Sequence, residues 1–336
     1  MKRLLTCVTA LFMLLTCIPL SGCSESVETD SDKLSIVTTC FPPYDFARAV
    51  TGGNADITML LCPGAEAHSY EPTPLDILKI QQCDVFIYIG GEGEVWADKI
   101  LDSFDSSGIT IIRLSDYADK LEEEAVAGAS PDGHHHHHDE EEHDEEPEEE
   151  HGHAHSHEEG EGFDEHIWTS LRNAEKCVEG IEHELCEVFP ENSESYSENA
   201  HSYIEQIRSL DEEYNEMTEN APSDLVVIGD RFPFRYLTHD YGLEYFAAFS
   251  GCSSESEPGV YTMAFLIDEL IGHELDTVFY LEFSTQRLAK KLSDATGAQM
   301  LPLHSCHNVS NEDFKNGTTY IDLMKQNYEN LREALY

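Results

Sequence analysis

Ten histidines lie close together among acidic residues near the middle of the chain, in a stretch without lysine or arginine. Neutral imidazole suits zinc, copper and nickel, so a dense histidine tract concentrates metal ligands without fixing their geometry. Apart from one proline, no side chain here is apolar and larger than alanine, so chain entropy outweighs burial. We expect a disordered, low-affinity metal-collecting loop and not an internal tag or a plain solvating linker. Its histidines are His134, His135, His136, His137, His138, His143, His151, His153, His155 and His157.

Four other histidines stand alone beside the expected ends of strands or helices. His68 lies in LLCPGAEAHSYEPTP after a strand, and His166 lies in GFDEHIWTSLRNA, where we expect a helix to begin. His304 and His307 follow the last strand in MLPLHSCHNVS. Loops at the carboxyl ends of parallel strands are where open α/β sheets bind ligands. Each histidine is therefore a candidate metal ligand, although a single loop histidine is more often an ordinary surface residue.

The overall charge also favours a cationic ligand. The 336 residues carry a formal net charge of −48. Such a surface argues against nucleic acid or anionic lipid as a partner and favours cations. The length and the 40% hydrophobic content allow two domains of ordinary size.

The first residues predict export from the cytoplasm. Two basic residues precede an apolar run from Leu4 to Leu20, which is too short to span a membrane in the mature protein. The run ends in Leu-Ser-Gly-Cys, which resembles a bacterial lipobox. We expect residues 1–22 to be a lipoprotein signal peptide, Cys23 to carry the lipid, and residues 23–33 to be a tether. An ordinary secretory signal is the alternative, and both predict an extracytoplasmic protein.

From Leu34 onward, short β-rich runs alternate with helical stretches, which predicts a parallel sheet covered on both faces. The expected strands are Leu34–Thr39, Ile57–Leu61, Val85–Ile89 and Ile109–Leu114. The expected helices are Pro43–Thr51, Pro74–Gln82 and Val95–Phe104. Thr73 is the expected N-cap of the second helix. The acidic loop, about residues 122–162, interrupts this lobe, and a helix from about Phe163 to Val188 completes it.

A long helix and a second lobe follow. Apolar residues at helical spacing predict a helix over Ser193–Thr218, roughly 39 Å long. The later strands are expected at Leu225–Ile228, Tyr245–Phe249, Thr277–Tyr280 and Gln299–Leu303, and the later helices at Val260–Gly272, Thr285–Ala295 and Thr319–Leu335. We therefore predict an α/β protein with lobes over residues 34–190 and 221–336, joined by a rigid helix over residues 191–220.

Several stretches together resemble the metal-binding lipoproteins of bacterial ABC transporters that take zinc or manganese. The resemblance covers nearly all of residues 34–336. It rests on TTCFPPYDFARAVTGG, PGAEAHSYEPTPLDI, DVFIYIGGEGEVW, a histidine-rich loop leading to DEHIW, YGLEYFAAFSGCSSESEP and TTYIDLMKQNYENLREAL. It implies two α/β lobes joined by one long helix, with the metal in the cleft between them and an ABC permease as partner.

The resemblance also implies metal ligands. His68 matches the family's first ligand, and His166 matches the second, although the usual proline before the histidine is absent. His307 falls on the fourth ligand, with His304 as the alternative. Three histidines favour Zn²⁺ over Mn²⁺, which prefers more oxygen ligands.

The third ligand departs from the family pattern. Arg231 falls where zinc-binding relatives have a histidine, and a guanidinium cannot ligate a cation. Two replacements are plausible from the sequence. In the first, Asp230 supplies an oxygen from the adjacent position. In the second, three histidines bind the metal, and water or a mobile carboxylate such as Glu66 completes the coordination. Arg231 would then pair with an acidic neighbour.

Seven cysteines follow the lipidation candidate, so at least one thiol stays free. Cys252 and Cys306 both follow strands of the second lobe, and we expect a disulfide between them. The leading functional prediction is a monomeric protein that captures Zn²⁺ and delivers it to an ABC permease, without enzymatic activity. A manganese-binding member of the family and an adhesin or zinc store are the alternatives. A zinc hydrolase is disfavoured because the chain has no HExxH pair.

Overall fold

The computed structural model describes residues 33–124, 126, 162–251 and 259–336, without the side chain of His68. The expected signal peptide, the lipidation candidate Cys23, the tether up to residue 32, most of the acidic loop with its ten histidines, and Cys252 lie outside the described residues. Within the described part of the chain, no helix is long and apolar enough to cross a membrane.

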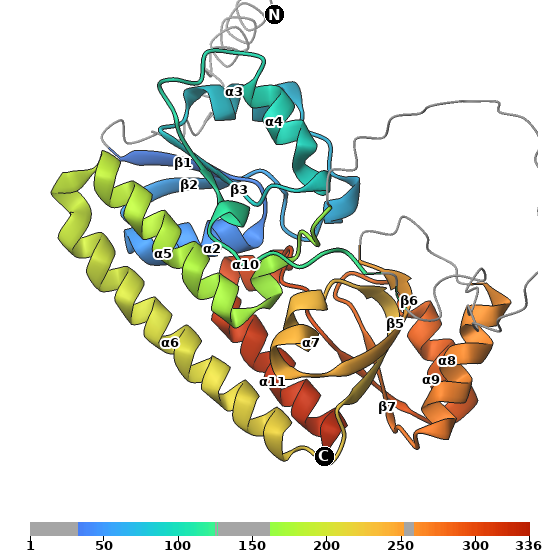
Figure 1. Ribbon diagram of the computed structural model, residues 1–336. Coiled ribbons are helices and arrows are strands. Elements are labelled where there is room, and N and C mark those ends of the chain that lie inside the picture. The colour runs from blue at the N-terminus through green and yellow to red at the C-terminus, as the bar shows by residue number, and fades with distance from the viewer. Residues whose placement is uncertain (1–32, 125, 127–161, 252–258) are drawn as a thin grey trace, which may run out of the picture. The chain divides into compact units, whose positions relative to one another are not determined.

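The first lobe is built on a sheet of four parallel strands. β1 (Leu34–Thr38), β2 (Ala55–Met59), β3 (Val85–Tyr88) and β4 (Thr110–Arg113) lie in the order β2-β1-β3-β4. Its helices are α2 (Phe41–Thr51), α3 (Pro74–Gln82), α4 (Val95–Leu101) and α5 (Leu171–Val188) (Figure 1). All four residues of β3 are buried, as expected for a continuous apolar run at the centre of a parallel sheet. The predicted strands are confirmed to within two residues, and Thr73 caps α3 in a capping box with Asp76.

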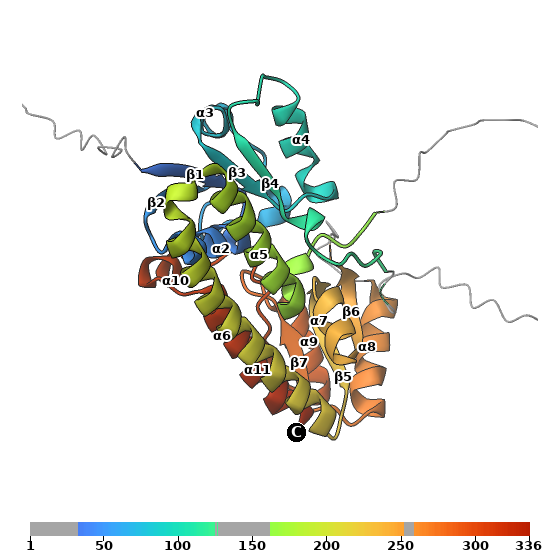
Figure 2. The same cartoon turned by 60° about the vertical axis from the view of Figure 1, so that its left-hand side comes forward.

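The long connecting helix is also confirmed, and it is slightly longer than predicted. α6 (Ser193–Asn220) has 28 residues, which corresponds to roughly 42 Å. Its buried side chains lie along one face, and α6 packs against α2, α5 and α11 (Tyr320–Leu335) (Figure 2). The helix therefore contacts elements that precede and follow it in the chain.

The second lobe repeats the strand order of the first. β5 (Leu225–Phe232), β6 (Glu244–Ser250), β7 (Thr277–Tyr280) and β8 (Gln299–Pro302) are parallel and lie in the order β6-β5-β7-β8. Its other helices are α7 (Arg235–Tyr241), α8 (Val260–Gly272), α9 (Arg287–Thr296) and α10 (Asn311–Asn316). In both sheets the order reverses at the central pair of strands, which is where open α/β sheets bind ligands.

Three expectations about local structure were wrong. The helix expected from about Phe163 begins only at Leu171, after a short turn over Ile167–Thr169, so His166 precedes that turn and does not begin a helix. Ser170 caps α5 by accepting a hydrogen bond from Asn173 N, whereas Phe163 forms an isolated antiparallel bridge with Glu122. The short helices α7 and α10 were not predicted because six or seven residues carry little periodic signal.

The predicted disulfide between Cys252 and Cys306 stays a prediction, because Cys252 lies outside the described residues. Cys306 is fully buried, and its Sγ lies 3.6 Å from the carbonyl oxygen of His304. Three other described cysteines, Cys40, Cys83 and Cys177, are buried and fill the hydrophobic core as small apolar side chains. By contrast, Cys62 is exposed and Cys186 is half-buried.

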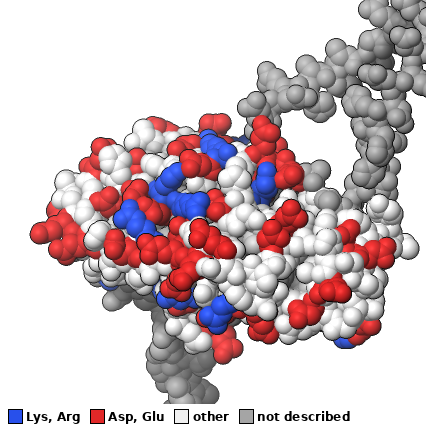
Figure 3. Space-filling model, turned by 60° about the horizontal axis from the view of Figure 1, so that its bottom comes forward, with Lys and Arg blue, Asp and Glu red and all other residues white. Residues whose placement is uncertain are grey.

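The acidic composition appears on the surface. Figure 3 shows carboxylates spread over the whole visible face, with the lysines and arginines in a few groups among them. Several ion pairs join α5 to α6. In one of them, Nη2 of Arg208 lies 2.6 Å from Oε1 of Glu175.

Candidate metal centre

Two of the candidate histidines lie side by side at the junction of the two sheets. The ring centroids of His166 and His307 are 5.8 Å apart, and the rings are nearly perpendicular, at 87°. Two imidazoles bound at the tetrahedral angle to one zinc, with Zn–N distances of about 2.0–2.1 Å, would have centroids roughly 5 Å apart. The separation of the two ring centroids is therefore close to that of two imidazoles on one zinc ion. Trp168 packs against both rings, and its ring centroid lies 5.4 Å from that of His166 and 4.8 Å from that of His307.

His166 is held in one orientation by Asp164. The side chain of His166 is fully buried, and its Nδ1 lies 2.9 Å from Oδ1 of Asp164. The same carboxylate oxygen accepts a hydrogen bond from the backbone N–H of His166, also at 2.9 Å. With Nδ1–H donated to Asp164, Nε2 is the ring nitrogen that would bind a metal.

The pair also shifts both titrations. Burial alone would lower the pKa of His166, but the charge and hydrogen bond of Asp164, together with the charges of Glu165 and Glu123, outweigh it. This pKa is therefore raised above its ordinary value of 6.5. Burial alone would raise the pKa of Asp164, but the interaction with His166 outweighs it and leaves that pKa below 3.8. Without metal, the two groups therefore tend towards an ion pair.

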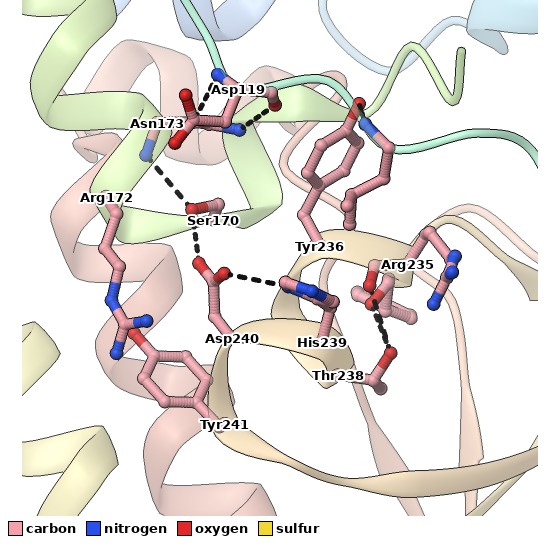
Figure 4. A network of polar contacts seen from close by, with 12 residues as sticks. Asp119, Ser170, Arg172, Asn173, Arg235, Tyr236, Thr238, His239, Asp240 and Tyr241 are labelled. Carbon is pink, nitrogen blue, oxygen red and sulfur yellow. Dashed lines mark hydrogen bonds and ion pairs between the residues drawn. The ribbon is translucent and has the colours of Figure 1, made fainter. Parts of the chain in front are cut away.

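The turn that carries His166 is fixed by contacts from the second lobe. Tyr236 of α7 donates its hydroxyl to the carbonyl oxygen of Asp164 at 2.7 Å, and it accepts from the backbone N–H of Leu121 at 3.2 Å. Trp168 donates Nε1–H to the carbonyl oxygen of Ser305 at 2.7 Å. Figure 4 shows Tyr236 together with a second link, in which Ser170 donates to Asp240 of α7.

A glycine makes room for the His166 ring. A Cβ added at Gly251, just after β6, would lie 3.2 Å from Cε1 of His166 and 2.9 Å from the carbonyl oxygen of Phe232. The backbone of the second lobe therefore closes directly on the imidazole, and any larger residue at this position would displace it.

His307 lies in a loop that is joined to the segment before His68. The buried side chain of Asn308 donates to the carbonyl oxygens of Cys62 and Ala65, at 2.9 and 2.8 Å. The carbonyl of His307 accepts from the backbone N–H of Phe41 at 3.2 Å. The loop after β8 and the loop after β2 therefore form one hydrogen-bonded unit.

His304 points to other partners. Its Nδ1 accepts a hydrogen bond from the backbone N–H of Cys306 at 2.9 Å and lies 3.7 Å from Glu282. Its backbone N–H donates to Asn327 at 2.6 Å. It contributes to neither of the two cavities at the site, so the structure brings His307 and not His304 to His166.

The two histidines line a cavity of about 190 Å³. Its wall is formed by the end of β5 and by the segments that follow β2, β7 and β8. Glu66, Asp230 and Arg231 also lie on this wall. Nη1 of Arg231 lies 2.9 Å from Oε1 of Glu66, and Oδ1 of Asp230 accepts from the backbone N–H of Arg231. A partly exposed ion pair of this kind contributes only about 0.2–1 kcal/mol, so Glu66 can exchange its partner at little cost.

A second cavity, of about 270 Å³, shares His307 and opens beside the base of the acidic loop. Glu94 and Glu165 line it. Glu94 accepts from the backbone N–H groups of Ile89 and Gly90, and burial raises its pKa to about 7. Glu165 accepts from the backbone N–H of Gly93 at 2.7 Å. This neighbouring wall is therefore acidic.

The backbone of His68 lies in the short turn Ala67–Ser69, next to cavity residues Glu66 and Ala67. Its side chain is not among those described. Among the described side chains, no three His, Cys, Asp or Glu residues converge as a metal would require. The structure thus brings His166 and His307 together, and it places the His68 backbone, Glu66 and Asp230 around the same cavity.

Sequence reasoning missed three residues that position this site. Asp164 was given no role, although a carboxylate two residues before a histidine can reach its Nδ1. Asn308 and Gly251 carried no local signal, because Cys62 is 246 residues away from Asn308 in the chain and His166 is also far from Gly251.

Comparisons with known proteins point to one family. Residues 36–334 match the family described as ZnuA, zinc-uptake complex component A periplasmic. The zinc-binding lipoprotein AdcA of Streptococcus pneumoniae is 33% identical over 337 residues, covering 98% of this chain but only 60% of that protein. The high-affinity zinc uptake system protein ZnuA of Bacillus subtilis is 29% identical, covering 98% of this chain and 96% of that protein.

Solved structures give the same result. The Zn(II)-bound ZnuA-like domain of S. pneumoniae AdcA has a TM-score of 0.69 at 30% identity, covering 90% of this chain and 99% of that one. The metal-dependent lipoprotein YcdH of B. subtilis has a TM-score of 0.72 at 26% identity, covering 90% of this chain and 100% of that one.

Proposed function

The chain belongs to the ZnuA family of zinc-uptake components, and from this premise we propose that it captures Zn²⁺ outside the cytoplasm and delivers it to an ABC permease. The observation that carries the proposal is the pair His166 and His307, 5.8 Å apart between the two sheets, with Asp164 orienting the first ring. Imidazole is a preferred zinc ligand, and a carboxylate behind it increases its basicity.

In the proposed site, Nε2 of His166, a ring nitrogen of His307 and the side chain of His68 bind the ion. Asp230, Glu66 or an external oxygen ligand completes the coordination. Arg231 pairs with Glu66 and takes no part as a ligand. Three imidazoles favour Zn²⁺ over Mn²⁺.

The remaining parts of the function are inferred from the sequence and the relatives. Residues 1–22 act as signal peptide and Cys23 as lipid anchor, in keeping with the name zinc-binding lipoprotein of the S. pneumoniae relative. The ten histidines of the acidic loop collect metal with low affinity. The chain works as a monomer and binds its cargo reversibly, without catalysing a reaction.

Zinc titration of five forms of the protein tests the proposal. The full chain and a form lacking residues 134–157 are each expected to keep one tight site. His166→Ala and His307→Ala are each expected to lose that site, whereas His304→Ala keeps it within about threefold. If the deletion removed the tight site and His166→Ala kept it, the proposed centre would be wrong and storage by the loop would be favoured.

A further inference from the structure

The cavity at the histidines gathers an unexpectedly large share of the few basic side chains of this acidic chain. The sequence holds 67 Asp and Glu but only 19 Lys and Arg. Three of the 19, Arg231, Arg287 and Lys291, line this one cavity. A site selected only to attract a bare divalent cation would not gather positive charge around it, because like charges within a few ångströms repel.

The carboxylates on the same wall are engaged in holding the loops. Glu66 is paired with Arg231, and Asp230 accepts from the backbone N–H of Arg231. Glu282 accepts from the backbone N–H of Ser305 at 2.8 Å and from its hydroxyl. The basic and acidic side chains therefore roughly cancel, and neutral imidazoles add no charge.

The start of α9 adds a further attraction for anions. Thr285, Gln286 and Arg287 at its first turn line the cavity, and no side chain caps this end. Gly229 lets the helix lie against the end of β5, because a Cβ there would be 2.9 Å from Cα of Ala289. A helix N-terminus presents backbone N–H groups and positive dipole, which favour an anion.

Zinc held by imidazoles would keep its two positive charges and, with three of them, an open fourth position. The family resemblance places Arg231 where relatives have a third histidine, and a guanidinium cannot ligate the metal there. We propose that the cavity takes Zn²⁺ together with a small carboxylate ligand. One oxygen of this ligand binds the metal, and its remaining charge is held by Arg231, Arg287 and the start of α9.

This inference rests on the proposed zinc capture and specifies its cargo as a zinc carboxylate complex. The size of the cavity, about 190 Å³, is below the roughly 300–1,000 Å³ of pockets for drug-sized ligands, so the carboxylate is small. Arg231 is well suited to it, since a guanidinium binds a carboxylate through two parallel hydrogen bonds. The incoming carboxylate would replace Glu66, whose side chain is 46% exposed, as the partner of Arg231.

The test measures the coupling between the two ligands. Zinc binding to the full chain is followed by equilibrium dialysis, with free Zn²⁺ fixed by a metal buffer, in the absence and presence of citrate. We expect citrate to tighten zinc binding at least about tenfold. In Arg231→Gln and Arg287→Gln, the ratio of zinc affinity with citrate to zinc affinity without it should fall towards one. Arg231→Lys should keep part of the citrate effect. Arg208→Gln on α6, which pairs with Glu175, is the matched control and should keep the full ratio.

Two further arms define the class of ligand. Phosphate is expected to give less than half of the citrate effect, and chloride none. A ratio of one in the unmodified chain, a ratio unchanged in both arginine variants, or a larger effect of phosphate than of citrate would overturn the proposal. Failure of zinc capture itself would be seen separately, as the absence of tight zinc binding without citrate.

Discussion

Replacing Asp164 by asparagine tests how the site prepares His166 for metal. Asn keeps the size of the side chain and an oxygen for the backbone N–H of His166, but it removes the charge 2.9 Å from Nδ1. Removal of such a carboxylate typically weakens metal binding by about 10–100-fold, or about 1.4–2.7 kcal/mol. We expect zinc affinity at pH 8 to fall by that factor.

The variant should also change the pH dependence of zinc binding. In the unmodified chain the raised pKa of His166 lets protons compete with zinc from above pH 6.5 downwards. Burial lowers that pKa, and without Asp164 it is opposed only by the weaker effects of the Glu165 and Glu123 charges. The fall in affinity should therefore begin at a lower pH in Asp164→Asn. Competition with a chromophoric chelator from pH 5 to 8.5 measures both effects.

The metal-free protein gives an independent reading of the same pair. The lowered pKa of Asp164 contributes stability that is lost as pH falls through that pKa, below 3.8. The raised pKa of His166 contributes stability that is present below 6.5 and is lost as pH rises through its folded value. Between these limits, near pH 5.5, the variant should lose about 1–3 kcal/mol of unfolding free energy, because His166 can release its proton instead of remaining an unpaired charge.

Asp98→Asn is the matched control, since Asp98 accepts from the hydroxyl of Tyr88 and pairs with Arg113, and it lines neither cavity at the site. Its zinc affinity should stay within about twofold of the unmodified chain. The reasoning would be refuted if Asp164→Asn bound zinc within twofold at pH 8 and its affinity fell over the same pH range as before.

Three other substitutions probe the surroundings of the site. Asn308→Ala leaves two carbonyl oxygens without their donor and should lower the free energy of chemical unfolding by about 2–4 kcal/mol. The control Asn330→Ala loses one exposed hydrogen bond and should lower it by under about 1 kcal/mol. Equal losses in the two variants would contradict this. Gly251→Ala presses on the His166 ring and should weaken zinc binding at least about tenfold, unlike Gly272→Ala, whose added Cβ meets nothing within 4 Å. Glu94→Gln should stabilise the protein by about 1–2 kcal/mol at pH 8. Burial raises the pKa of the Glu94 carboxyl to about 7, so its ionisation makes stability fall as pH rises from the unfolded pKa near 4.5. If the variant unfolded with the same pH dependence as the unmodified chain, Glu94 would not be the source of that fall.

The strands and the long helix could be predicted because their signals are local. The strand Val85–Tyr88 is a continuous buried run, and α6 places Tyr203, Ile207, Leu210, Tyr214 and Met217 on one buried face. The start of α5 was misjudged because residues before Leu171 form a separate short 3-10 turn over Ile167–Thr169. This turn is fixed in part by the distant Tyr236, which donates to the carbonyl oxygen of Asp164.

The candidate site was predictable only in part. His166 and His307 were found from their places in the chain and from the family resemblance, and the structure brings them together. The contact of Arg231 with Glu66 joins residues 165 positions apart, and the Asn308 contacts span still more, so no local pattern indicates them. The expected bridge between Cys306 and Cys252 stays a prediction, because Cys252 lies outside the described residues.

The central claim is that His166 and His307 hold one zinc ion between the two sheets. Crystals of the zinc-loaded chain, with diffraction recorded on both sides of the zinc absorption edge, test it most directly. We expect one dominant anomalous peak within about 2.0–2.1 Å of Nε2 of His166 and of a ring nitrogen of His307. A dominant peak that contacts neither ring would contradict the account.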